Sequence, residues 1–312
     1  MIISRHIKSE RLQLLSKRGS EFLGVEHPIL GGAMSWLSES KLVSAISNAG
    51  GFGVIACGSL NPIELGKEID KTKKLTDRPF GVNLITMHPQ LSELIDCCIK
   101  KNISHVVLAG SIPSVSSISS LKNAGVKVLG FAPALSLAKR LIKSGLDALI
   151  IEGLEAGGHV GPVSTNVLAQ EILPNISEVP IFVAGGIGRG EAMSFYLEMG
   201  ASGVQMGTRF VCAHECIAHE NFKKAFIRAN SRDAILSTQV DDRFPVIPVR
   251  SLKNKGTNLF LKRQKEVIND YDSGIKTLPE AQLDIEHFWA GALKKAAIDG
   301  DIDNGSVMAG QS

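Results

Sequence analysis

Short apolar runs recur along the chain, and each is followed by a segment whose apolar positions repeat with helical spacing. Bounded by turn residues and spaced roughly 25–30 residues apart, such runs are typical of strands that alternate with helices. The eight runs cover residues 27–30, 51–56, 80–85, 105–110, 126–131, 147–153, 180–186 and 203–207. Because eight parallel strands close into a barrel, the pattern predicts an α/β protein with a (β/α)8 TIM barrel.

Helices are predicted between the runs. In segment 38–49 the residues Leu42, Val43 and Ile46 share one face, and Gly50 follows as a C-terminal stop. Further helices are expected over 62–75, 91–101, 115–124, 136–144, 165–173 and 191–199. An alternation this regular favours one barrel over two unrelated domains.

The pattern changes after Arg209. Residues 210–312 are more polar, contain a proline-rich extended piece at 244–248, and are predicted to be mainly helical. We therefore expect an N-terminal segment over 1–24, a barrel over 25–209, and a C-terminal helical extension packed against the barrel. The length of 312 residues allows this, because one α/β barrel with insertions commonly exceeds about 250 residues.

Composition narrows the class of protein. The chain is 44% hydrophobic and 21% charged and has 31 glycines, which describes a globular core with many tight turns and excludes a disordered or coiled-coil chain. The 34 basic and 31 acidic side chains give a net charge of only +3. Without a clustered basic surplus, a nucleic-acid partner is not expected.

The five cysteines, at positions 57, 97, 98, 212 and 216, form neither a Cys-x-x-Cys pair nor the even set typical of secreted proteins. They indicate reduced thiols and a cytoplasmic location. The first 24 residues carry scattered charges and lack the apolar stretch of a secretion signal, and no window approaches ~18 uninterrupted apolar residues. Neither secretion nor a membrane partner is expected.

Two clusters outside the strand ends invite a functional interpretation. Residues 212–219 have the spacing Cys-x-His-x-Cys-x-x-His, but we predict one helix there, on which zinc ligands would not converge, and we expect no metal. The second cluster is basic, and a solvated helix face is favoured over a docking patch for an anionic carrier. Its members are Lys253, Lys255, Lys262, Arg263 and Lys265.

The active site of such a barrel lies at the carboxyl ends of the strands. Phosphate groups are commonly held there by the last two loops, through backbone N–H groups and a helix N-terminus. Both loops are rich in glycine: Gly185-Gly186 ends the seventh run and Gly207-Thr208 ends the eighth. Since glycine lacks the side chain that would block close approach, these residues predict a phosphate cradle, with tight turns as the alternative.

Glycines elsewhere at the barrel mouth need a second explanation. A phosphate occupies only one side of the mouth, whereas a flat ring such as isoalloxazine would approach the backbone of several loops. Asn83, in the third run, can donate and accept hydrogen bonds at the polar edge of such a ring, or can be a strand-end turn residue. The other candidates in these turns are Gly31, Gly32, Ala33, Met34, Gly157, Gly158, Gln205 and Met206.

His159 is the one histidine of eight that lies both at a strand's carboxyl end and in a glycine-rich loop. A neutral imidazole there can take a proton from a substrate carbon or return one near neutral pH. Glu152 and Glu155 precede it and are candidates for orienting it, with a helix or backbone role as the alternative for each. The residues thus predict a proton-transfer group beside a phosphate-bearing ligand, whose identity they leave open.

Together these motifs resemble the nitronate monooxygenase family, formerly called 2-nitropropane dioxygenases, and its close relative, the flavin-dependent enoyl-acyl-carrier-protein reductases. The resemblance covers nearly the whole chain, and the combination of EAGGH with QMGTRF is specific. The matching stretches are HPILGGAM, NAGGFGVI, PFGVN, EGLEAGGHVG, VPIFVAGGIG, VQMGTRF and DNGSVMAGQ.

The resemblance implies that residues 25–209 form an FMN-binding barrel in which His159 is the catalytic residue. Many nitronate monooxygenases are expected to have Gln where this chain has Glu152, and a Glu at this flavin-side position looks more like the enoyl reductases, as does the tail DGDIDNGSVMAGQ. The residues implied to bind the flavin are Asn83, Gly157, Gly186, Gln205, Met206, Gly207 and Thr208.

Oxidation of alkyl nitronates or nitroalkanes with dioxygen is the first activity implied, because it is the family's common label. The alternative is an enoyl-acyl-carrier-protein reductase using FMN; without a Gly-x-Gly-x-x-Gly unit, NAD(P)H would bind only transiently as the reductant. A second alternative is a flavin-free barrel that binds a phosphorylated metabolite. The partners expected are a small-molecule substrate, dioxygen and, for the reductase, acyl carrier protein; a homodimer is left open.

Overall fold

The eight predicted strands form a closed barrel. In the computed structural model, which describes residues 10–244 and 248–312, they are parallel and follow the order β1-β9-β8-β6-β5-β4-β3-β2. A parallel bridge between Leu30 and Phe52 joins the first and last strands of this order, so the sheet closes on itself and the predicted (β/α)8 barrel is confirmed. The barrel strands are β1 Ile29–Gly31, β2 Gly53–Ala56, β3 Phe80–Ile85, β4 His105–Ala109, β5 Lys127–Phe131, β6 Ala148–Glu152, β8 Ile181–Ala184 and β9 Gly203–Met206.

Each helix predicted around the barrel is present, with ends that differ from the prediction by two residues or fewer. Local signals explain these ends. Asn61, for example, caps α3 by accepting from the backbone N–H groups of Ile63 and Glu64, and Pro62 follows in the first turn, where no backbone donor is needed. The helices are α2 Ser40–Asn48, α3 Pro62–Leu75, α4 Leu91–Lys100, α5 Val115–Asn123, α6 Leu135–Lys143, α7 Thr165–Ile172 and α8 Gly190–Glu198.

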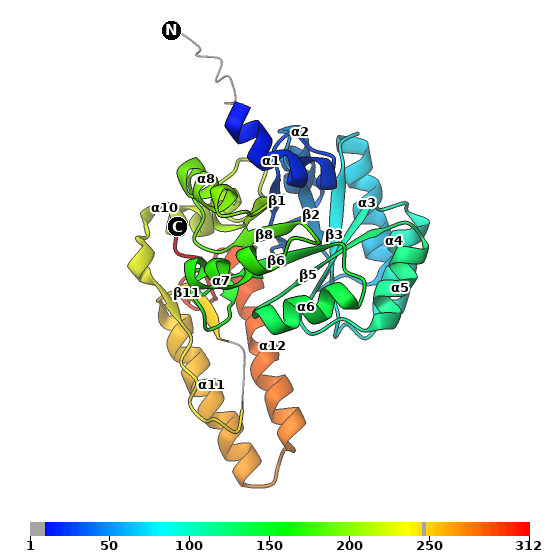
Figure 1. Cartoon of the computed structure of the whole chain (residues 1–312). Coiled ribbons are helices and arrows are strands. Elements are labelled where there is room, and N and C mark those ends of the chain that lie inside the picture. Colours follow the sequence, from blue (N-terminus) through cyan, green and yellow to red (C-terminus); the bar gives the residue numbers. More distant parts are fainter. Residues whose placement is uncertain (1–9, 245–247) are drawn as a thin grey trace.

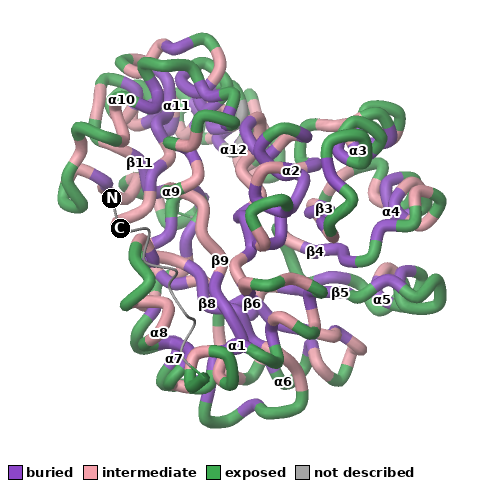
Figure 2. The backbone as a smooth tube through the Cα atoms, turned by 90° about the horizontal axis from the view of Figure 1, so that it is seen from above, coloured by how far each residue is buried: buried purple, intermediate pink, exposed green. Residues whose placement is uncertain are grey.

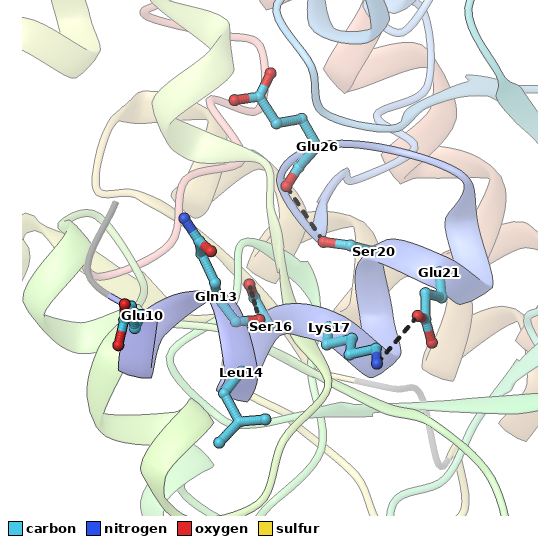
Figure 3. A pocket seen from close by; sticks show the side chains of 8 residues that line it. All are labelled: Glu10, Gln13, Leu14, Ser16, Lys17, Ser20, Glu21 and Glu26. Atoms are coloured by element: carbon cyan, nitrogen blue, oxygen red, sulfur yellow. Dashed lines mark hydrogen bonds and ion pairs between the residues drawn. The ribbon is translucent and has the colours of Figure 1, made fainter. Parts of the chain in front are cut away.

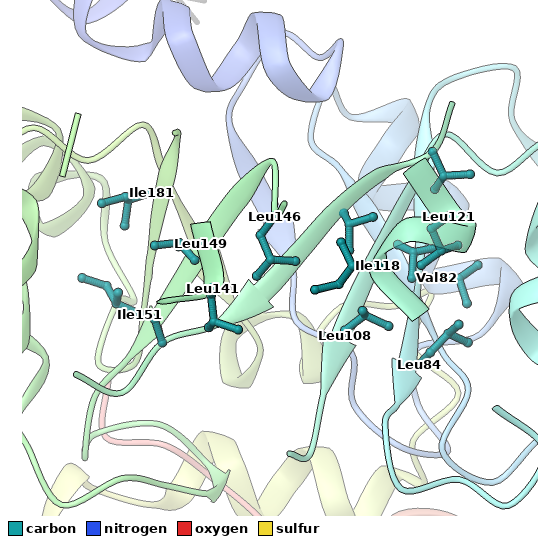
Figure 4. Packing of buried hydrophobic residues seen from close by; sticks show 14 of the residues in the cluster. Val82, Leu84, Leu108, Ile118, Leu121, Leu141, Leu146, Leu149, Ile151 and Ile181 are labelled. Carbon is teal, nitrogen blue, oxygen red and sulfur yellow. The ribbon is translucent and has the colours of Figure 1, made fainter. Parts of the chain in front are cut away.

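Two apolar layers stabilise the barrel. The larger lies between the strands and the surrounding helices, where Leu108 of β4 and Ile151 of β6 share one cluster with Ile118 of α5 (Figure 4). The smaller fills the barrel interior and includes Phe52 and Phe182, which are both fully buried. Figure 2 shows this arrangement: burial is concentrated along the strands, and the outer turns of the helices are exposed. Removal of this apolar surface from water is the main stabilising term of the fold.

Helix α1 (Glu10–Leu23) closes the barrel at the amino ends of the strands. Its Leu23 is fully buried in the interior cluster. The carbonyl oxygen of Phe22 lies 2.9 Å from Nε2 of His105, the first residue of β4. This end of the barrel is therefore filled by protein, and the carboxyl ends of the strands form the open mouth.

The C-terminal extension contains two long helices, α11 and α12, which run side by side away from the barrel (Figure 1). Phe260 and Trp289 join them, with ring centroids 4.1 Å apart. The extension also contains two strands that its polar pattern did not indicate, and these form a three-stranded sheet with β7, a short strand in the loop after β6. Two of the elements not yet given, β7 Gly158–His159 and η1 Leu173–Asn175, lie within the barrel part of the chain. The others follow β9 and are α9 Thr208–Val211, α10 Glu220–Arg228, η2 Ser231–Asp233, β10 Ala234–Leu236, β11 Val249–Leu252, α11 Lys255–Asp272 and α12 Leu278–Ala297.

The prediction of one helix across residues 212–219 is wrong. The segment consists of turns and irregular backbone between α9 and α10. His219 starts the next helix instead, because its Nδ1 atom accepts from the backbone N–H of Asn221 at 3.1 Å and so caps α10. Within residues 10–244 and 248–312, no group of three or more His, Cys, Asp or Glu side chains is arranged to hold a metal ion.

The predicted basic stretch lies mostly on α11, and part of its charge is paired. Arg263 lies 2.6 Å from Asp284 of α12, and Lys262 lies 3.8 Å from Glu266 one turn along its own helix. These ion pairs fit the solvated helix face that the sequence favoured. Exposed pairs of this kind contribute little to stability, typically ~0–1 kcal/mol.

Two sequence predictions extend beyond the part of the chain that the structure describes. They are the beginning of the N-terminal segment, residues 1–9, and the middle of the extended piece, residues 245–247. Among the helices that are described, none combines the length and the apolar character that a membrane span requires.

Candidate functional site

A cavity of about 1230 Å³ opens at the carboxyl ends of the barrel strands. Every barrel strand, or the turn that follows it, contributes to its wall, as expected for the active-site end of an α/β barrel. Pockets that hold one drug-sized ligand usually enclose ~300–1000 Å³. This cavity therefore has room for a cofactor and a substrate together.

The cavity brings together all the predicted site residues except Gly31. Those that line it are Gly32, Ala33, Met34, Asn83, Glu152, Gly157, Gly158, His159, Gly185, Gly186, Gln205, Met206, Gly207 and Thr208. Gly31 lies in β1, where a Cβ would come within 2.7 Å of Cδ1 of Ile46 on α2. Glycine is required at position 31 because α2 packs closely on the barrel there. Gly31 is not part of the cavity wall.

One half of the wall, which we call the glycine face, consists of Gly32, Gly157, Gly185, Gly186 and Gly207. These residues follow β1, β6, β8 and β9, which are neighbours in the barrel. Gly185 and Gly186 have φ angles of +96° and +72°, a conformation that glycine adopts without strain. A Cβ at Gly207 would meet only the side chain of Met34, 3.6 Å away, so the missing side chain leaves space at the cavity wall.

The N-terminus of α8 follows the loop that carries Gly185 and Gly186. Its N-cap residue, Arg189, makes no side-chain hydrogen bond to the helix and lies 3.0 Å from Glu191 instead. The N–H groups of an uncapped first turn bind anions well, because they lack partners within the helix and lie at the positive end of its dipole. Residues 188–191 do not line the cavity, however, so the phosphate end of a flavin nucleotide would meet the bare backbone at Gly185, Gly186 and Gly207, just before this helix.

Asn83 of β3 supplies a polar group on the opposite side of the cavity. Its side chain is 7% exposed and lines the cavity. Among the described residues, its amide has no hydrogen-bond partner. Since a buried amide is costly to leave unpaired, Asn83 is suited to bind the polar edge of a ring placed in the cavity.

His159 lies on β7, a strand that the sequence did not predict. β7 pairs antiparallel with β11 of the C-terminal extension, and His159 is opposite Val249. The backbone N–H of Val160 continues this pairing by donating to the carbonyl oxygen of Pro248 at 3.0 Å. The side chain of His159 is exposed and lines the cavity. The position of the predicted catalytic residue therefore depends on the extension as well as on the barrel.

Arg250 is a residue of this region that the sequence analysis missed. It is buried in β11, opposite Gly158. Its guanidinium donates from Nε to the carbonyl oxygen of Leu154 at 3.0 Å and from Nη1 to that of Ala234 at 2.6 Å. Leu154 belongs to the loop that leads from β6 to His159, so Arg250 joins this loop to the extension.

The two carboxylates predicted to orient His159 have different surroundings. Oε2 of Glu155 accepts from the backbone N of Thr165 at 2.8 Å and from its Oγ1 at 2.7 Å, so Glu155 joins the loop to the start of α7. Glu152 ends β6 and lines the cavity, and burial raises the pKa of its carboxyl to about 7. A carboxyl with this pKa is partly protonated near neutral pH and can then donate a hydrogen bond.

The C-terminal residues return to the mouth and complete its wall. Gly310 N donates to Oγ1 of Thr208 at 2.9 Å, and Gln311 N donates to the carbonyl oxygen of Glu155 at 2.8 Å. A Cβ at Gly157 would lie 2.6 Å from Gly310 N, so the tail and the loop after β6 pack backbone against backbone. The tail residues that line the cavity are Met308, Gly310 and Ser312.

The other half of the wall, which we call the apolar face, consists of Ile85, Met87, Val107, Ile112, Pro133 and Leu137. These residues belong to β3 and β4 and to the segments that follow β3, β4 and β5, which are again neighbours in the barrel. Among all the described residues that line the cavity, none is a lysine or an arginine. The titratable side chains are those of Glu152, Glu155 and His159.

A smaller hollow, of about 470 Å³, lies along α1 and away from the barrel mouth (Figure 3). Its polar side chains interact along the helix surface: Lys17 lies 3.8 Å from Glu21, and Ser20 donates to the carbonyl oxygen of Glu26 at 3.2 Å. The convergence of glycine loops, Asn83 and His159 is confined to the cavity at the mouth, which is therefore the candidate active site.

The chain is similar to known proteins over nearly its whole length. The chain matches the family model described as nitronate monooxygenase over residues 16–108 and 94–312. A probable nitronate monooxygenase of Staphylococcus aureus is 29% identical, over 95% of this chain and 91% of its own length.

Two further similarities concern a curated enzyme and a solved structure. The chain is 36% identical over 71% of its length to the (3aS,4S,5R,7aS)-5-hydroxy-7a-methyl-1-oxo-octahydro-1H-indene-4-carboxyl-CoA dehydrogenase of Rhodococcus jostii, and the match spans 62% of that enzyme. The structure of FabK from Thermotoga maritima has a TM-score of 0.83 at 33% identity, covering 94% of this chain and 88% of that one.

Proposed function

The chain belongs to the nitronate monooxygenase family of oxidoreductases, and on that premise we propose that it is an FMN-dependent reductase that uses NAD(P)H to reduce the double bond of an enoyl thioester. The observation that carries this proposal is the apolar face, which forms an uncharged half of the cavity wall. An acyl chain is apolar and a thioester group is neutral, so both match this half of the cavity. Coenzyme A or acyl carrier protein would be the thioester carrier.

The charges around the cavity favour a neutral substrate over an anionic nitronate. Among the described lining side chains, His159 is the one that can become positive, whereas Glu152 and Glu155 can become negative. An anion placed in a largely apolar cavity loses solvation, which costs several kcal/mol unless a cation pairs with it. A neutral thioester avoids this cost. The name of the Rhodococcus jostii relative, a carboxyl-CoA dehydrogenase, supports the same substrate class.

The glycine face and Asn83 are the residues that would hold FMN. The backbone at Gly185, Gly186 and Gly207 suits the phosphate, and the amide of Asn83 suits the polar edge of the ring. Bound FMN would supply a two-electron carrier between the nicotinamide and the substrate.

His159 would act on the carbonyl side of the thioester. Donation of a hydrogen bond to the carbonyl oxygen draws electrons from the conjugated double bond, so the β-carbon becomes the better hydride acceptor. In the overall reaction the β-carbon gains a hydride that originates from NAD(P)H, and the α-carbon gains a proton. The products are the saturated thioester and NAD(P)⁺.

Nitronate oxidation is the second candidate, and the match to the Staphylococcus aureus protein over 95% of this chain favours it. In that reaction a protonated His159 would pair with the nitronate anion, or a neutral His159 would take the α-proton of a nitroalkane. Dioxygen would be the oxidant.

A side-by-side assay of the FMN-loaded protein separates the candidates. With crotonyl-CoA present, we expect the absorbance of NADH or NADPH to fall only when the enoyl thioester is added. Oxygen uptake with ethyl nitronate, in the absence of enoyl-dependent nicotinamide oxidation, would overturn the proposal and support the second candidate. A protein that takes up no FMN from solution would contradict both and leave the flavin-free barrel that binds a phosphorylated metabolite.

A further inference from the structure

We infer that the apolar face is an acyl-chain subsite, which makes the enzyme selective for thioesters with medium or long acyl chains. This inference rests on the proposed thioester reduction and adds the substrate class. The members of the face are Ile85, Met87, Val107, Ile112, Pro133 and Leu137.

The position of the face follows from the strand order. The ring of strands runs β1-β9-β8-β6-β5-β4-β3-β2, so the glycine face and the apolar face occupy opposite halves of the mouth. His159 follows β6, the strand that borders β5 and therefore the boundary between the two halves. A substrate that reacts beside His159 can thus extend over β5 and β4 toward Ile85 and Met87, which follow Asn83 at the carboxyl end of β3, without crossing the glycine face.

Burial decreases along the apolar face from its floor to its rim. Val107 of β4, whose side chain belongs to the apolar cluster inside the barrel, is 2% exposed, whereas Ile112 is 51% and Met87 is 68% exposed. Leu283 of α12, which lines the same cavity, is 56% exposed. Large apolar side chains therefore continue from the buried floor to the surface, which is the arrangement that a chain longer than a few carbons requires.

The chemistry of the face selects an acyl chain over the polar parts of a substrate. None of the described residues that line the cavity from β3, β4, β5 and their following turns is charged. The phosphates of a nucleotide carrier would lack ionic partners there. An alkyl chain gains on the order of 0.8 kcal/mol for each methylene that it buries, which is about a fourfold gain in affinity.

The first test measures binding of product analogues, without turnover. Calorimetric titration of the FMN-loaded protein with butanoyl-CoA and dodecanoyl-CoA should show tighter binding of the longer chain, by roughly 30-fold or more if a few of its additional methylenes are buried. Equal dissociation constants for the two thioesters would overturn the subsite.

The second test measures selectivity in turnover. We expect kcat/KM for trans-2-dodecenoyl-CoA to exceed that for crotonyl-CoA. If neither enoyl thioester is reduced but dodecanoyl-CoA still binds more tightly than butanoyl-CoA, the proposed function fails and the acyl subsite stands. If both are reduced with equal kcat/KM, the proposed function stands and the subsite fails.

A pair of matched variants locates the effect. Ile112→Ser should reduce the ratio of butanoyl-CoA to dodecanoyl-CoA dissociation constants by roughly three- to tenfold, because part of the apolar rim is lost. Leu75→Ser is the control: Leu75 is 49% exposed, against 51% for Ile112, but it ends α3 and is not part of the cavity wall. An equal reduction in both variants would assign the preference to non-specific apolar binding and would overturn the subsite.

Discussion

The two halves of the barrel mouth are built in different ways. On the glycine face the wall is largely backbone, and its shape is set by contacts between main-chain segments, such as the 2.6 Å approach that a Cβ at Gly157 would make to Gly310 N. On the apolar face the wall consists of side chains, and exposure rises from 2% at Val107 to 68% at Met87. A backbone wall suits a ligand of constant shape, whereas a wall of aliphatic side chains can adapt to substrates of different length.

This difference between a backbone wall and a side-chain wall also implies different functions for the two halves. We expect changes on the glycine face to affect flavin binding, changes on the apolar face to affect substrate selectivity, and changes at their boundary to affect chemistry. Each of the following predictions tests that division.

His159 lies at the boundary, and its replacement should have the largest effect. We expect His159→Asn to lower kcat by about 10²–10⁴-fold, because the imidazole can no longer polarise or protonate the substrate. Binding of FMN, followed by quenching of its fluorescence, should remain close to wild type because the glycine face is intact. Wild-type turnover in this variant would show that the chemistry does not depend on His159.

A substitution of Arg250 tests whether the C-terminal extension holds the loop that carries His159 in position. Arg250→Met leaves the carbonyl oxygens of Leu154 and Ala234 without their donor, so we expect the free energy of unfolding to fall by about 2–4 kcal/mol. Because Arg250 would act by positioning the loop that carries His159, kcat should decrease by a larger factor than the affinity for FMN does. The matched control is the exposed Arg232, whose change to Met should alter stability by less than about 0.5 kcal/mol. If urea unfolding gives equal changes in the free energy of unfolding for the two substitutions, Arg250 does not have this role.

The sequence was sufficient for the barrel and for the glycine face because their signals are local. Apolar runs identify strands, and the turn after a run identifies the mouth, so Gly207 and His159 could be located from the pattern alone. Arg250 could not, because one of its acceptors, Leu154, is 96 positions away and any residue type offers the same carbonyl oxygen. The β7 strand, with only two residues, is too short to produce a periodic pattern.

The glycines themselves show the same limit. A glycine at a strand end predicts bare backbone, but the reason for it depends on contacts that the sequence does not display. Gly31 is required by Ile46 on α2, and Gly157 by the returning tail at Gly310. At Gly207 a Cβ would make only an ordinary contact with Met34, so a side chain is tolerated there but takes space from the cavity.

Gly207 therefore gives the sharpest test of the glycine face. We expect Gly207→Ala to weaken FMN binding by roughly 10–100-fold, because the new methyl group occupies the cavity wall, while stability changes by less than about 0.5 kcal/mol. Gly157→Ala should instead lower stability by about 1–3 kcal/mol, since it forces apart two backbone segments.

Gly291 of α12 provides the control for both glycine substitutions. It is exposed, and a Cβ there would have nothing within 4 Å. Gly291→Ala should raise stability by about 0.5–1 kcal/mol through helix propensity and should leave FMN affinity unchanged. Weaker FMN binding in Gly291→Ala to the same degree as in Gly207→Ala would contradict a local role for Gly207.

Glu152 tests the charge of the boundary, with the smallest expected effect among the changes at the cavity. Burial raises the pKa of its carboxyl from 4.5 to about 7 in the folded protein. A raised pKa means that the folded state binds the proton more tightly than the unfolded state, so the associated stability is fully present below about pH 4.5 and is lost as the pH rises through about 7. Glu152→Gln cannot ionise, and its stability relative to wild type should therefore increase between about pH 5 and pH 8, by about 1–2 kcal/mol in a cavity that admits solvent. Urea unfolding of the flavin-free proteins at both pH values measures this difference in stability. If the difference does not vary with pH, Glu152 is ionised at ordinary pH and the boundary holds a permanent negative charge.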